Sequence, residues 1–265
     1  MASSQLERAH AFRALHEGEP FLFPNPWDAG SARVLAALGF PALATTSAGL
    51  AFALGRLDGE VSLDDVADHT YALVEATGLP VAVDLENGFG PTPEDAARAV
   101  ARAAEAGAVG GSIEDWDGEA GLYELPHAVE RITAAVDAGR ALDFPFTLTA
   151  RAENHLRGNP DLDDTIARLQ AFEAAGADVI YAPGLASGAE IRAVADATTA
   201  PQNVLALPGL TMPEIVEAGG QRVSVGSQLT WVAVGAMARA VEDIRTTGSF
   251  EAFAEHVPIK DWLTN

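Results

Sequence analysis

The chain has 265 residues, with 38 acidic and 16 basic side chains, no cysteine and a formal net charge of −22. The lack of cysteine excludes disulfides, thiolate metal sites and cysteine nucleophiles. The only lysine, Lys260, is a poor candidate for Schiff-base or P-loop chemistry because it lies five residues from the end. Because the chain is strongly acidic, it should repel nucleic acid and anionic lipid, and we expect neither as a partner.

Short apolar runs alternate along the chain with longer amphipathic stretches, which is typical of repeated strand–helix units. We predict strands at 21–23, 42–46, 81–85, 109–114, 146–150, 179–182, 204–207 and 222–226. We predict helices at about 30–38, 62–77, 93–106, 124–138, 162–175, 188–197, 212–218 and 228–246. Eight units in about 250 residues indicate a single α/β domain, a closed (β/α)8 TIM barrel spanning 1–265, with an open doubly wound sheet as the rival fold.

The segment from about residue 247 is predicted to be an extra helical tail with exposed aromatic side chains, which either docks on its own barrel or contacts another copy. Residues 34–55 carry no charge, but Gly39, Pro41 and Gly55 interrupt them. We therefore predict a buried helix, a turn and a strand there and no membrane span. The N-terminal stretch lacks the pattern of an export signal, so we expect a cytoplasmic protein.

Acidic side chains follow the predicted strands at their carboxyl ends, where a barrel places its active site. Asp84 and Glu86 share one face of the third strand, because side chains alternate along a strand. Glu114 ends the fourth strand, and Arg151 and Glu153 follow the fifth. Hard oxygen ligands without His or Cys suit Mg²⁺ or Mn²⁺ better than Zn²⁺. The alternative is an internal salt-bridge network around Arg151.

Other segments offer weaker candidates. The stretch 45–49, Thr-Thr-Ser-Ala-Gly, presents a hydroxyl and backbone amides to a carboxylate, or is a plain turn. The turns at Gly209 and Gly226 lie where many barrels hold phosphate, although such glycines also serve as ordinary turn residues. His127 and His155 are expected in loops near the ends of the fourth and fifth strands, where either one is a candidate acid or base.

Six segments in order resemble the isocitrate lyase and phosphoenolpyruvate mutase superfamily. They are Trp27-Asp28-Ala29-Gly30-Ser31-Ala32-Arg33, Thr46-Ser47-Ala48-Gly49, Leu57-Asp58-Gly59, Val83-Asp84-Leu85-Glu86-Asn87-Gly88-Phe89-Gly90, Ser112-Ile113-Glu114-Asp115 and Ala150-Arg151. Their order and spacing match the family from about residue 20 to 245. The resemblance implies a (β/α)8 barrel whose last helix is exchanged between subunits of a homodimer or homotetramer.

The resemblance also implies site residues. Mg²⁺, or Mn²⁺ in its place, would be held by Asp84 directly or through waters, with Asp58, Glu86 and Glu114. Ser47, the neighbouring positions Thr46, Ala48 and Gly49, and Arg151 would hold the carboxylate of a 2-oxo or 2-hydroxy acid, with Asn203 as a further substrate contact. The shared intermediate is a pyruvate-type enolate bound to the metal. Arg151 and Glu114 are the expected catalytic residues.

The chain departs from the family in the loop after the fourth strand. Lyases carry Lys-(Lys/Arg)-Cys-Gly-His there, whereas residues 116–124 contain no thiol, lysine or histidine, so that Tyr123 or Glu119 would have to act as the general acid. Thr45 replaces an aromatic residue, and the sixth strand ends in Ala182-Pro183 where lyases carry a carboxylate. An acidic loop would repel a phosphoryl group in transit, which disfavours mutase and phosphonate hydrolase chemistry.

We therefore expect a Mg²⁺-dependent carbon–carbon lyase that acts on a small 2-oxo or 2-hydroxy di- or tricarboxylate, by decarboxylation or retro-aldol cleavage. One alternative is a catalytically weak 2-oxo acid binding protein with the same fold. A phosphonopyruvate or phosphoenolpyruvate type phosphomutase or hydrolase is another, and a phosphate-handling isomerase that uses the turns at Gly209 and Gly226 is the third.

Overall fold

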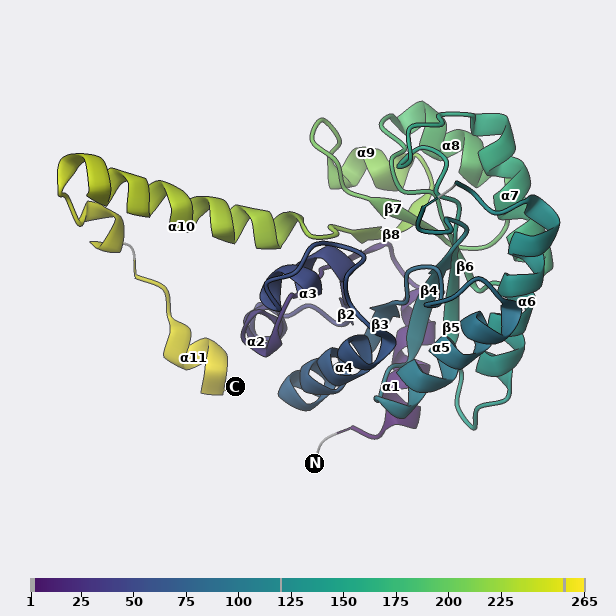
Figure 1. Cartoon of the computed structure of the whole chain (residues 1–265), viewed down its shortest axis with the longest axis horizontal. Coiled ribbons are helices and arrows are strands. Elements are labelled where there is room, and N and C mark those ends of the chain that lie inside the picture. Colours follow the sequence, from purple (N-terminus) through teal and green to yellow (C-terminus); the bar gives the residue numbers. More distant parts are fainter. Residues whose placement is uncertain (1–2, 120, 255, 265) are drawn as a thin grey trace.

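Eight parallel strands form one sheet that curls into a nearly closed barrel in the computed structural model, which describes residues 3–119, 121–254 and 256–264 (Figure 1). The strands are β1 (Phe21–Phe23), β2 (Leu43–Ala44), β3 (Val81–Asp84), β4 (Gly110–Glu114), β5 (Thr147–Arg151), β6 (Val179–Tyr181), β7 (Gln202–Leu205) and β8 (Gly220–Ser224). Their order in the sheet is β1-β8-β7-β6-β5-β4-β3-β2. The Ala44 amide donates to the Pro24 carbonyl at 3.0 Å and links the two ends. The predicted TIM barrel is confirmed.

The helices lie between the strands as predicted. They are α1 (Gln5–Leu15), α2 (Ala29–Ala37), α3 (Ser47–Ala53), α4 (Leu63–Thr77), α5 (Pro93–Glu105), α6 (Leu125–Arg140), α7 (Leu162–Ala174), α8 (Gly188–Ala197), α9 (Met212–Glu217), α10 (Gln228–Thr247) and α11 (Ile259–Thr264), with a 3₁₀ turn η1 (Glu251–Ala254). Capping boxes fix several starts, such as Ser62 with Asp65 and Thr92 with Asp95. Predicted ends differ from the observed ones by at most two residues.

Three helices were not predicted with their bounds: α1, α3 and the tail helix α11. The segment after β2, expected to be a turn, begins the short helix α3 at Ser47, because Thr46 takes the extended conformation of an N-cap residue. The helix α1 closes the amino-terminal end of the barrel. Its Phe12 ring lies 5.4 Å from the ring of Phe23, which points into the barrel. Apolar rings therefore form part of the floor of the barrel.

The main core lies between the outer faces of the strands and the surrounding helices. Val83, Leu85 and Ile113 are buried there against α5 and α6 residues such as Val100 and Ile132. Because side chains alternate along a strand, burying Val83 and Leu85 outside the barrel turns Asp84 inward. The same alternation turns Glu114 inward beside Ile113. The core thus fixes the direction of the acidic side chains.

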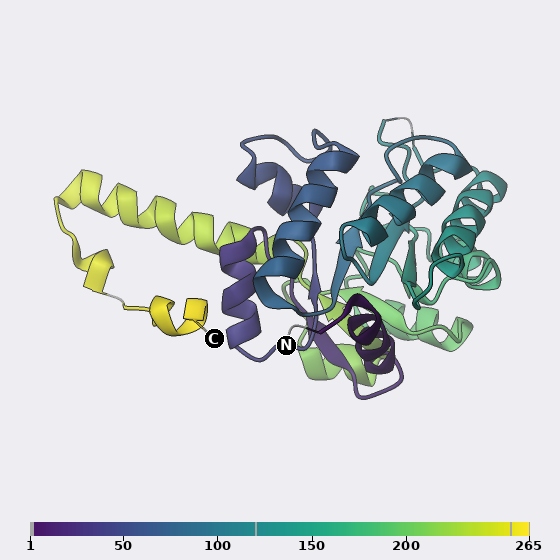
Figure 2. The same ribbon diagram turned by 90° about the horizontal axis from the view of Figure 1, so that it is seen from below.

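The last barrel helix, α10, does not cover the sheet but extends away from it in both views (Figure 1 and Figure 2). Among the residues of α10 only Thr230 is buried, whereas Val232, Met237 and Val241 are 65%, 60% and 58% exposed. The helix α11 returns to the body of the molecule, where Arg33 Nη1 donates to the Leu263 carbonyl at 2.6 Å. Exchange of α10 between subunits stays a prediction, since one chain does not test it.

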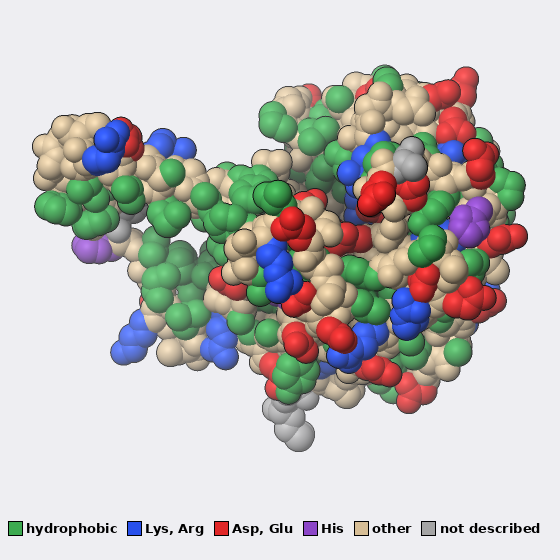
Figure 3. Space-filling view, in the orientation of Figure 1, with side chains coloured by type: hydrophobic (Ala, Val, Ile, Leu, Met, Phe, Trp, Pro, Cys, Tyr) green, Lys and Arg blue, Asp and Glu red, His purple; other side chains and the backbone are tan. Residues whose placement is uncertain are grey.

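The tail is helical in part, as expected, and it exposes aromatic rings. Phe250 and Phe253 are 64% and 62% exposed, and their ring centroids lie 5.8 Å apart. Hydrophobic side chains gather along the projecting arm in the space-filling view (Figure 3). None of the helices in the described part of the chain has the length and apolar character needed to cross a bilayer.

Candidate active site

A cavity of about 630 Å³ opens at the carboxyl ends of the strands. Nine of the predicted site residues line it: Thr46, Ser47, Ala48, Asp58, Asp84, Glu86, Glu114, Arg151 and Asn203. Two of the predicted residues, Gly49 and Tyr123, are not among those that line the cavity. The structure therefore brings together residues that lie up to 157 positions apart in the sequence, from Thr46 to Asn203. Their individual roles stay predictions.

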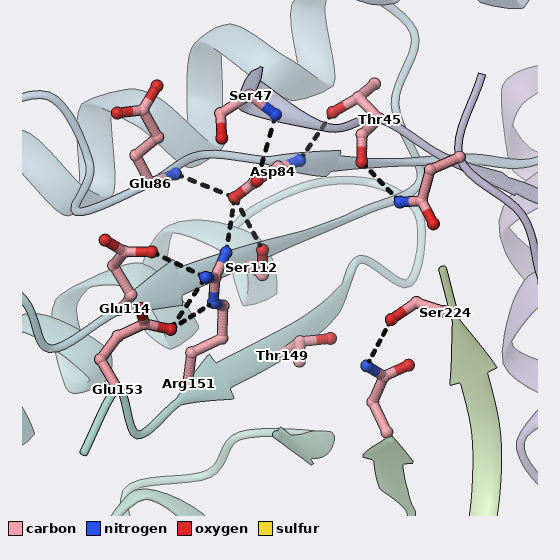
Figure 4. A network of polar contacts seen from close by, with 12 residues as sticks. Thr45, Ser47, Asp84, Glu86, Ser112, Glu114, Thr149, Arg151, Glu153 and Ser224 are labelled. Atoms are coloured by element: carbon pink, nitrogen blue, oxygen red, sulfur yellow. Dashed lines mark hydrogen bonds and ion pairs between the residues drawn. The ribbon is translucent and has the colours of Figure 1, made fainter. Parts of the chain in front are cut away.

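Arg151 lies at the centre of the acidic cluster (Figure 4). Its guanidinium contacts Asp84 at 2.9 Å, Glu114 at 3.0 Å and Glu153 at 2.8 Å. Burial lowers the pKa of Arg151, but Glu153, Glu114 and Asp84 together hold it well above the ordinary value. The salt-bridge network considered from the sequence is thus present. A permanently charged guanidinium therefore lines the cavity.

Asp84 is the most connected of the carboxylates. Besides Arg151, it accepts hydrogen bonds from the Ser47 amide at 3.3 Å, the Glu86 amide at 3.3 Å and the Ser112 hydroxyl at 3.5 Å. Its own amide donates to Thr45 Oγ1 at 2.8 Å. Residues that follow β2 and β3, together with residues of β4 and β5, therefore fix Asp84, which is the preorganisation that a ligand-binding carboxylate needs.

The loop after β3 holds Glu86 in a strained conformation. Glu86 and Phe89 have φ angles of 47° and 59°, in the left-handed region that non-glycine residues rarely adopt. Between them, Gly88 has φ 83°, and a Cβ there would lie 2.9 Å from the Cα of Ala96. Strained backbone of this kind collects at functional sites.

Arg131 fastens this loop from behind. It is 1% exposed, and its guanidinium donates to the carbonyls of Asn87, of Gly90 at 2.8 Å and of Thr92 at 3.0 Å. It also lies over the ring of Tyr123, 4.5 Å from the centroid. The loop that carries Glu86 and the loop that follows β4 are therefore joined through Arg131.

The excess of acid in the cavity fits a hard divalent cation. Burial, together with the charges of Asp84 and Asp58, raises the pKa of Glu86 to about 8, and its buried Oε1 has no hydrogen-bond partner. Burial, with the charges of Glu153 and Asp84, also raises the pKa of Glu114 against the pull of Arg151. Carboxylate oxygens of this kind are the ligands that Mg²⁺ and Mn²⁺ prefer.

These carboxylates do not form a ready-made coordination shell. Within the described ranges, no group of three or more Asp, Glu or His side chains is arranged to hold a metal ion. Arg151 stands between Asp84 and Glu114, and Asp58 lies on an exposed loop. The donor chemistry therefore fits a cation, and the shell would assemble by movement of these side chains.

Described residues of the loop after β4 pair across the loop. Trp116 and Leu122 form an antiparallel bridge, and the Asp117 amide donates to the Gly121 carbonyl at 3.0 Å. Trp116 lines the cavity and stacks on Arg157, whose guanidinium carbon lies 4.8 Å from the ring centroid. Arg157 in turn contacts Glu114 and Glu153, both at 3.2 Å. An arginine from the β5–α7 loop thus supplies a cation at the mouth of the cavity.

The remaining candidates are dispersed. Tyr123 packs on Arg131 and His127, so its expected role as a general acid has no geometric support. His127 lies within α6 and not in a loop, because Leu125 and Pro126 already belong to the helix, and its Nε2 contacts the Pro91 carbonyl at 2.8 Å. His155 Nδ1 pairs with Thr165 Oγ1 at 3.2 Å. Neither histidine is among the cavity residues, and of the two glycine turns only Gly226 is.

Arg157, Tyr181 and Arg222 are among the cavity residues that were missed from the sequence. Strand alternation could have found two of them. Tyr181 ends β6 in the pattern Val-Ile-Tyr, and Arg222 shares the inward face of β8 with Ser224. Arg157 lies in a turn after β5, where no periodicity signals its direction.

A family model described as phosphoenolpyruvate phosphomutase matches residues 12–245. The chain belongs to this family. It is 32% identical to an oxaloacetate decarboxylase of Bradyrhizobium diazoefficiens, over 96% of this chain and 87% of that protein. It is also 32% identical to a 2-methylisocitrate lyase of Halalkalibacterium halodurans, over 98% of this chain and 89% of that protein.

Solved structures agree with this assignment. A Burkholderia cenocepacia protein, described only as a putative lyase/mutase, is 53% identical and superposes with a TM-score of 0.95 over 98% of this chain and 97% of that one. The resemblance to the isocitrate lyase and phosphoenolpyruvate mutase superfamily is thereby confirmed. Relatives in the phosphoenolpyruvate phosphomutase family are named as lyases, which supports the expected enzyme class.

Proposed function

We propose that the protein is a Mg²⁺-dependent carbon–carbon lyase that acts on a small 2-oxo or 2-hydroxy di- or tricarboxylate. The observation that carries the proposal is the acid-rich cavity in which Arg151 and the surplus carboxylates Asp84, Glu86 and Glu114 meet. Such a cavity offers both a cation for a substrate carboxylate and oxygen ligands for a divalent metal. The names of the relatives, oxaloacetate decarboxylase and 2-methylisocitrate lyase, support the same chemistry.

The substrate carboxylate is assigned to Arg151 and to the start of α3. Arg151 offers a charged, planar donor that is held in place by three carboxylates. The amides of Thr46, Ser47 and Ala48 belong to residues that line the cavity at the N-terminus of α3, where amides favour anions. Together they would orient the 2-oxo group toward the acidic side of the cavity.

Asp84, Asp58, Glu86 and Glu114 would hold the metal ion. A bound Mg²⁺ would supply Lewis-acid chemistry at the 2-oxo group of the substrate. When the carbon–carbon bond breaks, its electron pair moves toward the oxygen of that group and leaves an enolate. For a 2-oxo dicarboxylate, carbon dioxide departs, and the enolate takes up one proton to give the 2-oxo acid product.

Tyr181 is the best placed residue to supply that proton. It is the only tyrosine among the described residues that line the cavity, and Arg151 lies over its ring at 5.4 Å. Burial raises the pKa of Tyr181 to about 12, so the hydroxyl stays protonated at neutral pH. A protonated hydroxyl that can donate is what the missing thiol of the family loop would otherwise provide.

The proposal is tested by a turnover screen with and without a chelator. Oxaloacetate, 2-methylisocitrate and isocitrate are each incubated with Mg²⁺ or with EDTA, while carbon dioxide and 2-oxo acid products are followed. We expect one of them to be cleaved only when Mg²⁺ is present. Binding of these acids without any turnover would instead favour the 2-oxo acid binding protein. Cleavage that persists in EDTA would contradict the metal-dependent proposal.

A further inference from the structure

Arg222 is a buried charge that has no counter-ion. Its residue is 4% exposed and lines the same cavity as Arg151, but deeper in the barrel. Its three hydrogen bonds go to neutral groups: Nε to Asn203 Oδ1 at 2.8 Å, Nη2 to Thr149 Oγ1 at 3.0 Å and Nη1 to His16 Nε2 at 3.1 Å. In the part of the chain that the structure describes, no carboxylate forms an ion pair with it.

The uncharged state of His16 follows from its own contacts. The Phe12 carbonyl can only accept, so His16 Nδ1, 2.9 Å away, carries the proton. His16 Nε2 is then the acceptor for Arg222 Nη1. Burial, with the charge of Arg222, lowers the pKa of His16 to about 3, which agrees with a neutral ring. His16 therefore offers no compensation for the charge of Arg222.

Arg151 and Arg222 form a contrast within one cavity. Both are buried, but Arg151 has three carboxylate partners whereas Arg222 has none. Burial lowers the pKa of Arg222 to about 9, whereas that of Arg151 is raised. Burying a guanidinium without an anion is costly, and structures usually avoid it. Arg222 is thus a buried cation that lacks an anionic partner among the described residues.

The part of the cavity wall formed by β2 and β3 carries small side chains. The inward residues of β2 and β3 below Asp84 are Ala44 and Ala82, and both line the cavity with Gly111. Small side chains at these positions let the cavity extend inward to Arg222 and Asn203. A larger residue at either alanine would fill this space, as the barrel layers of other members of the fold are filled.

Arg222 contacts β5 two residues before Arg151, and this offset suits a short dicarboxylate. Thr149, the contact of Arg222, and Arg151 lie on one face of β5, and their Cα atoms are roughly 7 Å apart along the strand. A four- or five-carbon chain reaches about 4–5 Å between its terminal carbons. Hydrogen bonds of about 2.8 Å at each end would extend this reach enough to span the offset of two residues along β5.

We propose that Arg222, with Asn203 and Thr149, forms a second anion subsite in the barrel that binds the inner carboxylate of the substrate. The outer carboxylate then lies at Arg151. This inference rests on the proposed function only where it calls the bound anion a substrate. It narrows that substrate to a dicarboxylate of four or five carbons. A monocarboxylate of the same length would leave Arg222 without its counter-ion.

The test compares 2-oxoglutarate with 2-oxopentanoate, which has the same carbon chain but only one carboxylate. Binding to the full chain is measured by calorimetry, with and without Mg²⁺. We expect the wild type to bind 2-oxoglutarate at least tenfold more tightly. In Arg222→Met this preference should fall below twofold, while the affinity for 2-oxopentanoate stays within twofold of the wild type. Retention of the preference in Arg222→Met, or its absence in the wild type, would overturn the proposal.

The thermal unfolding temperature distinguishes a ligand-binding role of Arg222 from a purely structural role. Because Arg222 lacks a counter-ion, Arg222→Met without ligand should unfold at the wild-type temperature or above it. Arg131→Met is the matched comparison and should unfold at a lower temperature, since Arg131 donates to three backbone carbonyls. If Arg222→Met unfolds well below the wild type and keeps the dicarboxylate preference, Arg222 is structural and the proposal fails.

Asn203→Asp provides a second variant if Arg222→Met does not fold. It places a carboxylate beside Arg222 Nε without changing the size of the side chain. We expect a higher unfolding temperature and loss of the dicarboxylate preference, because the internal carboxylate replaces the ligand. An unchanged preference in this variant would contradict the proposal.

Two controls test the chemical class of the ligand and separate its binding from the proposed lyase reaction. If inorganic phosphate raises the unfolding temperature of the wild type but not of Arg222→Met, with no preference for 2-oxoglutarate, the assignment to a carboxylate is wrong. The binding comparison needs no turnover. Failure of every substrate to be cleaved would therefore contradict the proposed lyase activity and leave the result on the subsite standing.

Discussion

Arg151 Nη1 lies 2.9 Å from Asp84 Oδ1, although their strands β5 and β3 are separated by β4. The contact spans the mouth of the barrel and joins the residue expected to bind the substrate carboxylate to the one expected to bind the metal. Asp84 also accepts from the amides of Ser47 and Glu86. Substrate on Arg151 and a cation on Asp84 would therefore act on two side chains that are in contact, which links their binding.

We expect Tyr181, and not Tyr123, to be the proton donor. Tyr181 lines the cavity, whereas Tyr123 packs on Arg131 outside it. We expect Tyr181→Phe to lower kcat by about 100-fold, within the usual range for loss of a general acid, and Tyr123→Phe to change it less than threefold. Steady-state kinetics on the substrate found by the screen checks both. A larger loss in Tyr123→Phe than in Tyr181→Phe would reverse the assignment.

Glu153 is expected to be a large contributor to stability. It is fully buried, and it contacts Arg151 at 2.8 Å and Arg157 at 3.2 Å. Glu153→Gln removes the charge from this network, so we expect the free energy of unfolding to fall by about 3–5 kcal/mol in urea titrations. The control is Glu242→Gln, whose partner Arg245 is exposed. That exposed pair should contribute little to stability, because solvent screens it. Equal effects of the two variants would contradict this account of the network.

Acid should destabilise the fold through His69. Burial lowers the pKa of His69 to about 4, and its buried Nε2 has no hydrogen-bond partner. Below the unfolded pKa of about 6.5, the unfolded chain binds a proton that the folded chain excludes, so stability falls as the pH decreases. Between pH 7.5 and 5.0 the loss from this residue is about 2 kcal/mol.

His69→Leu isolates this effect, because leucine cannot titrate and leaves no unpaired nitrogen. Urea unfolding of the wild type and of His69→Leu is measured at pH 7.5 and pH 5.0. The decrease in stability should be smaller in the variant by about 2 kcal/mol. The same decrease in both proteins would show that His69 is not excluded from protonation in the fold.

The projecting helix α10 predicts self-association. Val232 and Met237 are 65% and 60% exposed on a helix with a single buried residue among those described. We propose that a second copy covers this face, as the exchange of the last helix in the family implies. Light scattering after gel filtration should give a dimer or tetramer, and Val232→Glu with Met237→Glu should give a smaller species. A monomeric wild type would contradict this prediction.

Much of the fold could be predicted because its signals are local. Alternation along a strand and capping boxes such as Ser62 with Asp65 fix direction and boundaries within a few residues of sequence. The helix α3 escaped because Thr46 caps it without a side-chain hydrogen bond, so the sequence has the look of a turn. The departure of α10 from the barrel has no local signal, since its sequence is amphipathic like that of a packed helix.

Site residues that lie on strands could be predicted from the sequence, whereas those that lie on loops could not. Asp84, Glu114 and Arg151 follow from strand alternation and the family motifs, and all three line the cavity. Arg157 depends on the path of the β5–α7 turn and on stacking with Trp116, which are long-range contacts. Arg222 was overlooked because its significance lies in the absence of a partner, which only the packed barrel reveals.

The central claim is that Asp84 serves a metal-dependent cleavage, and Asp84→Asn tests it most directly. The substitution keeps the size of the side chain and removes the charge that pairs with Arg151 and that would hold Mg²⁺. Mg²⁺ affinity by calorimetry and cleavage of the substrate are measured together on the wild type and the variant. We predict that Mg²⁺ binding is lost and that kcat/KM falls at least about 1,000-fold. Undiminished turnover in Asp84→Asn, with Mg²⁺ bound as in the wild type, would contradict the account.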